Sequence, residues 1–183
     1  MTKLKTFIFA LTFILQDCIE NPILNDIEMM RKSPVTIPYS EFVSFENTDS
    51  GLDSDYRFII YIDSTDCSTC SLKNMYYWEN ILDSLTKYKS NISVNPIFSP
   101  RRTILNRFLN NLQEYNFRFP IYVDTCNAFL RANPHIPSNP LLHSFLLDEN
   151  DSVILVGNPI RNKKIEELFF KILEERKDKQ DKK

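Results

Sequence analysis

Hydrophobic residues along this chain alternate between strand-like runs and stripes at helical spacing. The run at residues 56–63 ("YRFIIYID") predicts a buried strand, and residues 92–98 ("ISVNPIF") predict the next, in which Pro96 favours an irregular or edge position. A third strand is expected at residues 119–123 ("FPIYV"). Residues 142–157 contain two short strand-like runs around a turn rich in Asp, Asn and Glu, a pattern typical of an antiparallel hairpin.

Helices are expected between and after these strands. Residues 68–89 place apolar side chains on roughly one face, and the next helix begins at residues 99–100, with serine as N-cap and proline in the first turn. Residues 126–131 predict a short helix, and the proline-rich residues 132–140 predict a loop that no regular element can cross. Residues 165–173 carry apolar side chains at i, i+3, i+4, i+7 and i+8, which predicts a closing helix with one face buried on a sheet.

The segments around this series are assigned from their composition. With 183 residues, of which 43% are hydrophobic, the chain can bury one sizeable core, and we expect a single domain at residues 56–175. Residues 19–55 form an N-terminal extension, in which residues 37–46 add one strand to the sheet and residues 47–55 form a turn-rich loop. Residues 176–183 alternate in charge and predict a solvated, frayed tail.

Residues 1–18 have the composition of a secretory signal. Lys3 and Lys5 give a positive start, and residues 7–15 are apolar except for one threonine, a run too short for an ordinary membrane-spanning helix. The following "LQDC" resembles the lipobox of bacterial lipoproteins, with Cys18 as the lipid anchor and an aspartate where a small residue is usual. There are two alternatives to a lipoprotein signal: a plain signal peptide cut nearby, and a buried cytosolic helix. Either signal predicts a domain outside the cytoplasm, where disulfides persist.

Charge and glycine content exclude two classes of function. The formal net charge is −2 and no dense Lys/Arg block occurs, so the electrostatic footprint of a nucleic-acid-binding protein is missing. The two glycines, Gly51 and Gly157, are too few for the glycine-rich phosphate loops of nucleotide-binding proteins. We therefore expect no nucleic-acid partner and no nucleotide bound by those routes.

The candidate chemistry lies in "DSTDCSTC", at the junction between the first predicted strand and the helix after it. Cys67 and Cys70 have the spacing of a redox dithiol or of half a zinc site. A helix N-terminus favours a thiolate, so Cys67 would attack, while Cys70, one turn inside and shielded by the helix, would resolve the mixed disulfide. The acids Asp63 and Asp66 disfavour that thiolate, which points towards a reductase.

The order of elements around the two cysteines resembles the thioredoxin fold, an α/β fold with a central mixed sheet flanked by helices. More narrowly, the signal segment, "FPIYVD" and the hairpin "FLLDENDSVILVGNPI" are similar to the extracytoplasmic TlpA/ResA-like thioredoxins. The resemblance covers about residues 56–173. It implies a thiol-disulfide oxidoreductase of the bacterial cell envelope that needs no cofactor or metal, with Cys67 as the first motif cysteine and Cys70 as the resolving one.

Departures from the family pattern fall around the expected substrate-docking residues, which are Asp66, Pro140, Leu142 and His143. Asp66 stands where the family has tryptophan. Leu142 stands at the position of the family's cis-proline with His143 next to it, so either the loop shifts Pro140 into place or the cis-proline is missing. Tyr61 stands where many thioredoxins have a buried acid, which puts general-base assistance in doubt.

The implied partners are protein disulfides or dithiols and a membrane redox protein, with a monomer held at the membrane through its N-terminal anchor. A catalytically degenerate thioredoxin-like adaptor, a peroxide-reducing relative and a zinc-binding module remain as alternatives. In the zinc alternative, Cys126 and either His135 or His143 complete a site with the motif cysteines. Otherwise we expect Cys126 to be a partly buried structural cysteine and the histidines to be satisfied at the surface.

Overall fold

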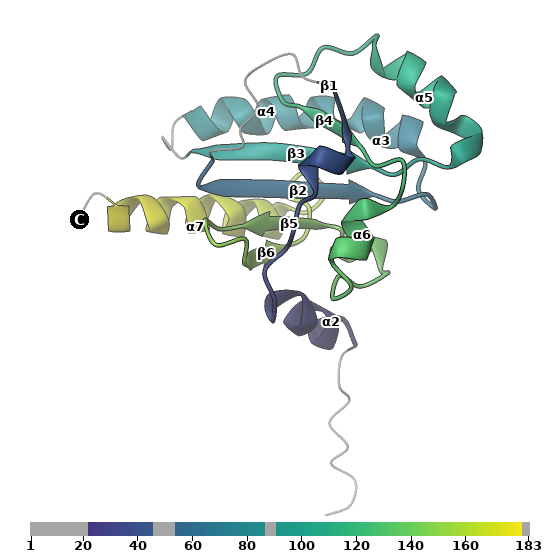
Figure 1. The fold of residues 1–183 in the computed structure, drawn as a ribbon. Helices are drawn as coiled ribbons and strands as arrows, with labels where there is room; N and C mark the ends of the chain where they lie inside the picture. Colours follow the sequence, from purple (N-terminus) through teal and green to yellow (C-terminus); the bar gives the residue numbers. More distant parts are fainter. Residues whose placement is uncertain (1–21, 46–53, 87–90, 181–183) are drawn as a thin grey trace, which may run out of the picture.

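The computed structural model describes residues 22–45, 54–86 and 91–180, and these form an α/β structure around one mixed sheet (Figure 1). The sheet has six strands in the order β1-β4-β3-β2-β5-β6. The strands are β1 (Val43–Phe45), β2 (Tyr56–Ile62), β3 (Ile92–Phe98), β4 (Ile121–Val123), β5 (Ser144–Leu147) and β6 (Val153–Val156). The helices are α2 (Pro22–Arg31), α3 (Ser68–Asn74), α4 (Tyr76–Leu85), α5 (Leu105–Leu112), α6 (Ala128–Ala132) and α7 (Lys163–Gln180).

The register of the sheet confirms the predicted thioredoxin-like arrangement. β2 runs parallel to β3 from the pair Tyr56 and Ile92 to the pair Ile62 and Phe98. β5 lies antiparallel on the other side of β2, β6 lies antiparallel to β5, and α7 follows. A parallel pair with a helical crossover, followed by a hairpin and a closing helix, places the C-terminal end of β2 at the centre of the sheet.

Alternating residues of β2 enter two separate cores, as expected for a strand covered on both faces. Phe58 and Ile60 point to the first face, where they join buried side chains of α3, α4, α5 and α7. Ile59 and Tyr61 point to the second face, among side chains of the N-terminal segment, α6 and the hairpin. We call these the helix-covered face and the strap-covered face.

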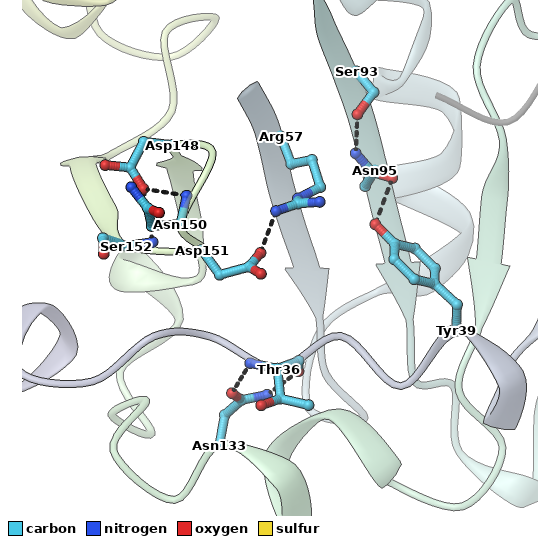
Figure 2. A network of polar contacts seen from close by, with 10 residues as sticks. All are labelled: Thr36, Tyr39, Arg57, Ser93, Asn95, Asn133, Asp148, Asn150, Asp151 and Ser152. Carbon is cyan, nitrogen blue, oxygen red and sulfur yellow. Dashed lines mark hydrogen bonds and ion pairs between the residues drawn. The ribbon is translucent and has the colours of Figure 1, made fainter. Parts of the chain in front are cut away.

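The strap is the N-terminal segment of residues 32–42, which crosses the sheet in front of β2 and β3 in Figure 1. Its backbone at Thr36 donates to Asn133 Oδ1 over 2.8 Å and accepts from Asn133 Nδ2 over 2.7 Å. Tyr39 Oη donates to the buried Asn95 Oδ1 over 3.2 Å, and Arg57 pairs with Asp151 beside it (Figure 2). The N-terminal extension adds a strand to the sheet as predicted, but this strand is Val43–Phe45 instead of residues 37–46, and the sequence pattern missed α2 and the strap.

The helix predicted at residues 68–89 is two helices, α3 and α4. They are separated at Met75, whose N–H donates to Leu72 O, while Trp78 N–H donates to Met75 O. Both bonds span three residues instead of four, so the chain tightens locally between α3 and α4.

Two further helices begin later than the sequence predicts. Ser99 does not cap a helix, because its N–H donates to Ile62 O over 2.8 Å and so continues the sheet. A 3₁₀ turn at Arg102–Ile104 then leads into α5. The helix expected at residue 126 begins at Ala128, after Asn127 in the left-handed conformation with φ of 58°.

The edge position predicted for Pro96 is wrong, since β3 lies between β4 and β2. β4 pairs with β3 only at Ile97 and Phe98, and Asp124 N–H donates to Phe98 O. Backbone groups alternate sides along a strand, so Pro96 faces the same side as Phe98, at a level where β3 and β4 form no pair, since their pairs are only Ile97 with Tyr122 and Phe98 with Val123. The proline therefore removes no bond from the ladder.

The C-terminal segment is more regular than predicted, because the backbone of α7 stays helical to Gln180. The predicted signal segment, Cys18 and most of the loop at residues 47–55 lie outside the described residues. Within the described ranges, no helix has the length and apolarity that crossing a membrane requires.

Candidate active site

Cys67 and Cys70 form a disulfide where β2 leads into α3. The loop of residues 63–66 connects the two elements, and the Cα atoms of the two cysteines lie 5.3 Å apart. Cys67 is the N-cap of α3, and its Sγ accepts a hydrogen bond from Cys70 N–H over 3.3 Å. The unpaired backbone donors of the helix start are therefore directed at the sulfur that we expect to attack.

Both cysteines are exposed, so the expected shielding of Cys70 by the helix is wrong. The buried face of α3 carries Ser68, which is 1% exposed, and Leu72, which is 0% exposed. Cys70 lies two residues from each, which at helical spacing places it on the opposite side. The disulfide thus lies open to solvent above a buried helix face.

Asp63 holds the loop that leads into Cys67. Its Oδ1 accepts from both N–H and Oγ1 of Thr65 over 2.6 Å, and its backbone oxygen accepts from Asp66 N–H over 3.2 Å. Partial burial raises the pKa of Asp63, but the hydrogen bonds from Thr65 and the charge of His143 outweigh burial and lower it below the usual range. Asp63 therefore stays ionised and keeps a negative charge close to the disulfide.

Tyr61 occupies the strand position at which the family resemblance would place a buried acid. Its side chain is 3% exposed, and its hydroxyl donates to Asn127 Oδ1 over 3.1 Å. Burial raises the pKa of Tyr61 to about 12, a direction that Asp124 and Asp63 reinforce and a hydrogen bond with Ser99 opposes. This phenol does not act as a base at neutral pH.

His143 is buried at 1% exposure, which contradicts the expected surface histidine. Its Nε2 lies 2.8 Å from Pro137 O, and its ring packs edge-on against Tyr61 at a centroid distance of 5.3 Å. Because a carbonyl oxygen only accepts, Nε2 carries the hydrogen. The remaining nitrogen, Nδ1, has no hydrogen-bond partner and lies 4.0 Å from Asp63 Oδ2.

No described peptide bond is cis, so Pro140 does not supply the family's cis-proline. Pro140 instead begins a 3₁₀ turn, Pro140–Leu142, capped by Asn139, whose side chain accepts from Leu141 N–H over 3.1 Å. The turn delivers Leu142 and His143 into the core of the strap-covered face. Of the two alternatives that the sequence leaves open, the missing cis-proline is the one observed.

A groove of about 710 Å³ lies between the α3–α4 region and the segment before α7; it is lined by Asp66 and Ser71, the neighbours of Cys67 and Cys70 in the chain, but by neither cysteine. Of the predicted docking residues, Asp66 and Pro140 line this groove, whereas Leu142 and His143 do not. The sequence analysis missed its most exposed apolar members, which are Leu141 at 73% and Tyr77 at 57% exposure. Leu141 directly follows the proline-rich loop, and the apolar pair that it forms with Leu142 was a usable signal for it. Nothing in the sequence singles out Arg161, which also lines the groove.

Cys126 is a free, exposed thiol, so the expected partial burial is wrong. Its N–H is held by Asp124 Oδ1 over 3.2 Å, but its side chain is outside the core. It lines a second, shallower groove together with Asp63 and Thr65. Within the described ranges, no three His, Cys, Asp or Glu side chains are grouped to hold a metal ion, and the zinc alternative gains no support from the geometry.

No protein-family model matches the chain, and no curated protein matches it. Among solved structures, a thioredoxin-like protein from Bacteroides caccae ATCC 43185 is similar at 15% identity and a TM-score of 0.49, over 81% of this chain and 53% of that one. The chain thus spans about half of that protein. The C-terminal domain of an uncharacterized protein from Bacteroides fragilis NCTC 9343 is similar at 14% identity and a TM-score of 0.43, over 63% of this chain and 79% of that one. These likenesses carry no argument about activity, and the fold assignment rests on strand order and register.

Proposed function

We propose that this chain is a thiol-disulfide oxidoreductase in which Cys67 attacks and Cys70 resolves. The observation that carries the proposal is the exposed Cys67–Cys70 disulfide at the start of α3, directly after the central strand of a thioredoxin-like sheet. A structural disulfide at this spacing closes too short a loop to constrain the unfolded chain strongly. Exposure instead makes both sulfurs accessible to exchange.

In the proposed reaction the reduced chain reduces a substrate disulfide. The Cys67 thiolate attacks one substrate sulfur, the substrate S–S bond breaks, and its electron pair leaves on the other substrate sulfur, which takes up a proton. Cys70, as a thiolate, then attacks Cys67 Sγ and releases the second substrate sulfur, which is also protonated. The substrate gains two electrons, and the chain ends with the disulfide observed here. The nearby acids Asp63 and Asp66 favour this reducing direction.

Protein disulfides are the proposed substrates, and the groove lined by Asp66 and Ser71 is their proposed docking surface. Tyr77 and Leu141 offer exposed apolar contacts, and Arg161 adds a positive charge. Asp66 lies on the disulfide side of this surface in place of the tryptophan expected from the family resemblance. A polar residue there favours partners with polar segments around their cysteines.

The proposed location is the bacterial cell envelope, with a membrane redox protein as the recycling partner. The support is the composition of residues 1–18, with a short apolar run after two lysines and Cys18 in a lipobox-like context. A lipidated chain partitions into detergent and loses this behaviour in Cys18→Ser. Unchanged partition in the variant removes the lipid anchor from the proposal.

Trapping with cysteine variants tests the proposed function. Cys70→Ser is expected to attack substrates and stall as mixed disulfides that can be isolated from cells, whereas Cys67→Ser is expected to trap nothing. Cys126→Ser, which removes an exposed thiol outside the motif, serves as the matched control and keeps wild-type exchange. Equal trapping by both motif variants refutes the assigned roles. No trapping by either favours the adaptor, a reading that the missing cis-proline also supports.

A further inference from the structure

Nδ1 of the His143 imidazole, which faces Asp63 of the motif loop, and Ser68 Oγ, next to Cys67, are both buried without a hydrogen-bond partner, and of the two only the imidazole can take up a proton. Its Nε2 hydrogen is used by Pro137 O, which fixes the ring and leaves Nδ1 as the nitrogen open to a further proton. Nδ1 is buried without a hydrogen-bond partner, and the closest carboxylate oxygen is Asp63 Oδ2 at 4.0 Å. A neutral Nδ1 and a carboxylate oxygen both only accept, which explains why the pair stays apart at this distance.

Asp63 divides its two oxygens between the motif loop and the histidine. Oδ1 is fully engaged by Thr65, whereas Oδ2 is the oxygen that faces His143. Asp66 N–H is bound to the backbone oxygen of Asp63, and Cys67 is the next residue along the chain. The charge of Asp63 is therefore held rigidly near Cys67, and it opposes the Cys67 thiolate.

We propose that His143 is a positioning residue that sets the reactivity of Cys67 through Asp63. A proton on Nδ1 turns the 4.0 Å separation into an ion pair between the buried imidazole and the partly buried carboxylate, which offsets the carboxylate charge at the motif loop. Without that proton the carboxylate charge acts on Cys67 undiminished. The inference rests on the proposed function, because it concerns the same disulfide centre and describes how that centre responds to pH.

Asp63 is the charged group that the structure places next to His143. The titratable groups that the structure places against it are Tyr61, which packs edge-on from β2, and Asp63 from the loop after β2. Asp124, which acts electrostatically on Tyr61, has its own carboxylate bound by the N–H groups of Cys126, Ala128 and Phe129. A buried partner makes the pair less sensitive to salt than a surface pair.

The test follows the alkylation rate of Cys67 by iodoacetamide against pH, localised by mass spectrometry in the reduced full chain carrying Cys70→Ser. His143→Gln keeps an amide N–H for Pro137 O but takes up no proton. At mildly acidic pH we expect this variant to react about three- to tenfold more slowly than its parent, because the Asp63 charge in the loop before Cys67 is no longer offset. The two profiles should converge at alkaline pH, where neither chain carries the extra proton.

Asp63→Asn is a second variant for the same alkylation experiment, and it leaves the buried histidine in place. The amide oxygen still accepts from Thr65, the negative charge is gone, and Cys67 should react about three- to tenfold faster than the parent at the same pH. In this background His143→Gln should have no further effect, because the residue acts through Asp63. His135→Gln, in the same loop but without a carboxylate partner in the described structure, is the matched control and should leave the profile unchanged.

The proposal is overturned if His143→Gln reacts like its parent at every pH, or if its effect persists in full in Asp63→Asn. Alkylation needs no substrate disulfide, so this result is independent of the trapping experiment. A chain that traps partners but shows no His143 effect refutes only the inference. A chain that shows the effect but traps nothing refutes the oxidoreductase and keeps the His143–Asp63 pair.

Discussion

The two faces of the sheet are built in different ways, although they share the same central strands. On the helix-covered face, Phe58 packs against Trp78 and Phe169 at centroid distances of 4.6 and 5.6 Å in an apolar, largely aromatic core. On the strap-covered face, buried Asn95 bonds to Ser93 Oγ and to Tyr39 Oη under an extended segment. The first face is stabilised mainly by apolar burial, and the second also depends on polar groups that must find specific partners.

The Cys67–Cys70 disulfide lies where these two faces meet. Cys67 and Cys70 belong to α3, which covers one face, while His143 and Tyr61 belong to the core of the other. Asp63, at the end of β2, is in contact with both through its backbone, Thr65 and His143. The difference shows that the motif helix packs on one face of the sheet, while the imidazole that faces Asp63 belongs to the other.

The largest expected loss of stability comes from truncating a buried side chain of the helix-covered face. Phe58→Ala removes a fully buried ring from contact with Trp78 and Phe169, and we expect the free energy of unfolding to fall by about 3–5 kcal/mol in a urea titration. Leu168→Ala on α7, at a position 46% exposed, is the control and should change stability by less than about 0.5 kcal/mol. A loss below about 1 kcal/mol in Phe58→Ala contradicts the account of this face.

A smaller loss is expected when the strap is released. Asn133→Ala removes the side chain that binds Thr36 N–H and O and the oxygen of Phe129, which costs about 1–3 kcal/mol because buried backbone groups are left unpaired. Amide hydrogen exchange should show lost protection at Thr36 and retained protection in α4. The exposed Asn110→Ala is the control. Equal loss of protection on both faces shows that they do not open separately.

Alkaline pH should weaken the strap-covered face by a further, smaller amount. An unfolded tyrosine loses its proton near pH 10, whereas burial first of all raises the pKa of Tyr61 to about 12 in the folded chain. The folded state thus binds more protons in this window, and stability falls as pH rises from 10 to 12, by at most about 1.4 kcal/mol per pH unit for this residue.

Tyr61→Phe tests this contribution by thermal or urea unfolding across that window. The variant should lose stability less steeply than wild type, although some alkaline loss remains because burial also raises the pKa of Tyr39. Tyr76→Phe, at a position 51% exposed on α4, is the control and should follow the wild-type curve. An unchanged slope in Tyr61→Phe shows that the buried phenol does not couple pH to stability.

The sequence predicts the helix-covered face better than the strap-covered face for a physical reason. Strand runs and helical stripes such as residues 165–173 are local patterns, and they place the sheet, the hairpin and α7 correctly. The strap has no periodicity, because Thr36 and Tyr39 are fixed by Asn133 and Asn95, far away along the chain. The start of α5 fails for the same reason, since Ser99 N–H is bound to Ile62 O of the sheet. The late start of α6 is a local feature, because the Asp124 carboxylate accepts from the N–H groups of Cys126, Ala128 and Phe129 and Asn127 is left-handed.

The candidate site divides in the same way. Cys67 and Cys70 are found from spacing and from their place after a strand, which are local features. The pairing of His143 with Asp63 joins residues 80 apart in the numbering, 63 and 143, and needs the register of β5 on β2. The prediction that Cys70 is shielded was wrong for a simpler reason. Ser68 and Leu72 form the buried side of α3, and Cys70 lies on the opposite side at helical spacing.

The central claim is that Cys67 and Cys70 form a reversible redox couple, and a redox titration of the full chain tests it most directly. The chain is equilibrated in glutathione buffers of graded potential, and the fraction of each cysteine protected from alkylation is measured by mass spectrometry. The account predicts that Cys67 and Cys70 become protected together in one two-electron transition, while Cys126 stays outside that transition as a separate exposed thiol. Free Cys67 and Cys70 in every buffer, or a Cys67–Cys70 disulfide that no buffer reduces, contradicts it.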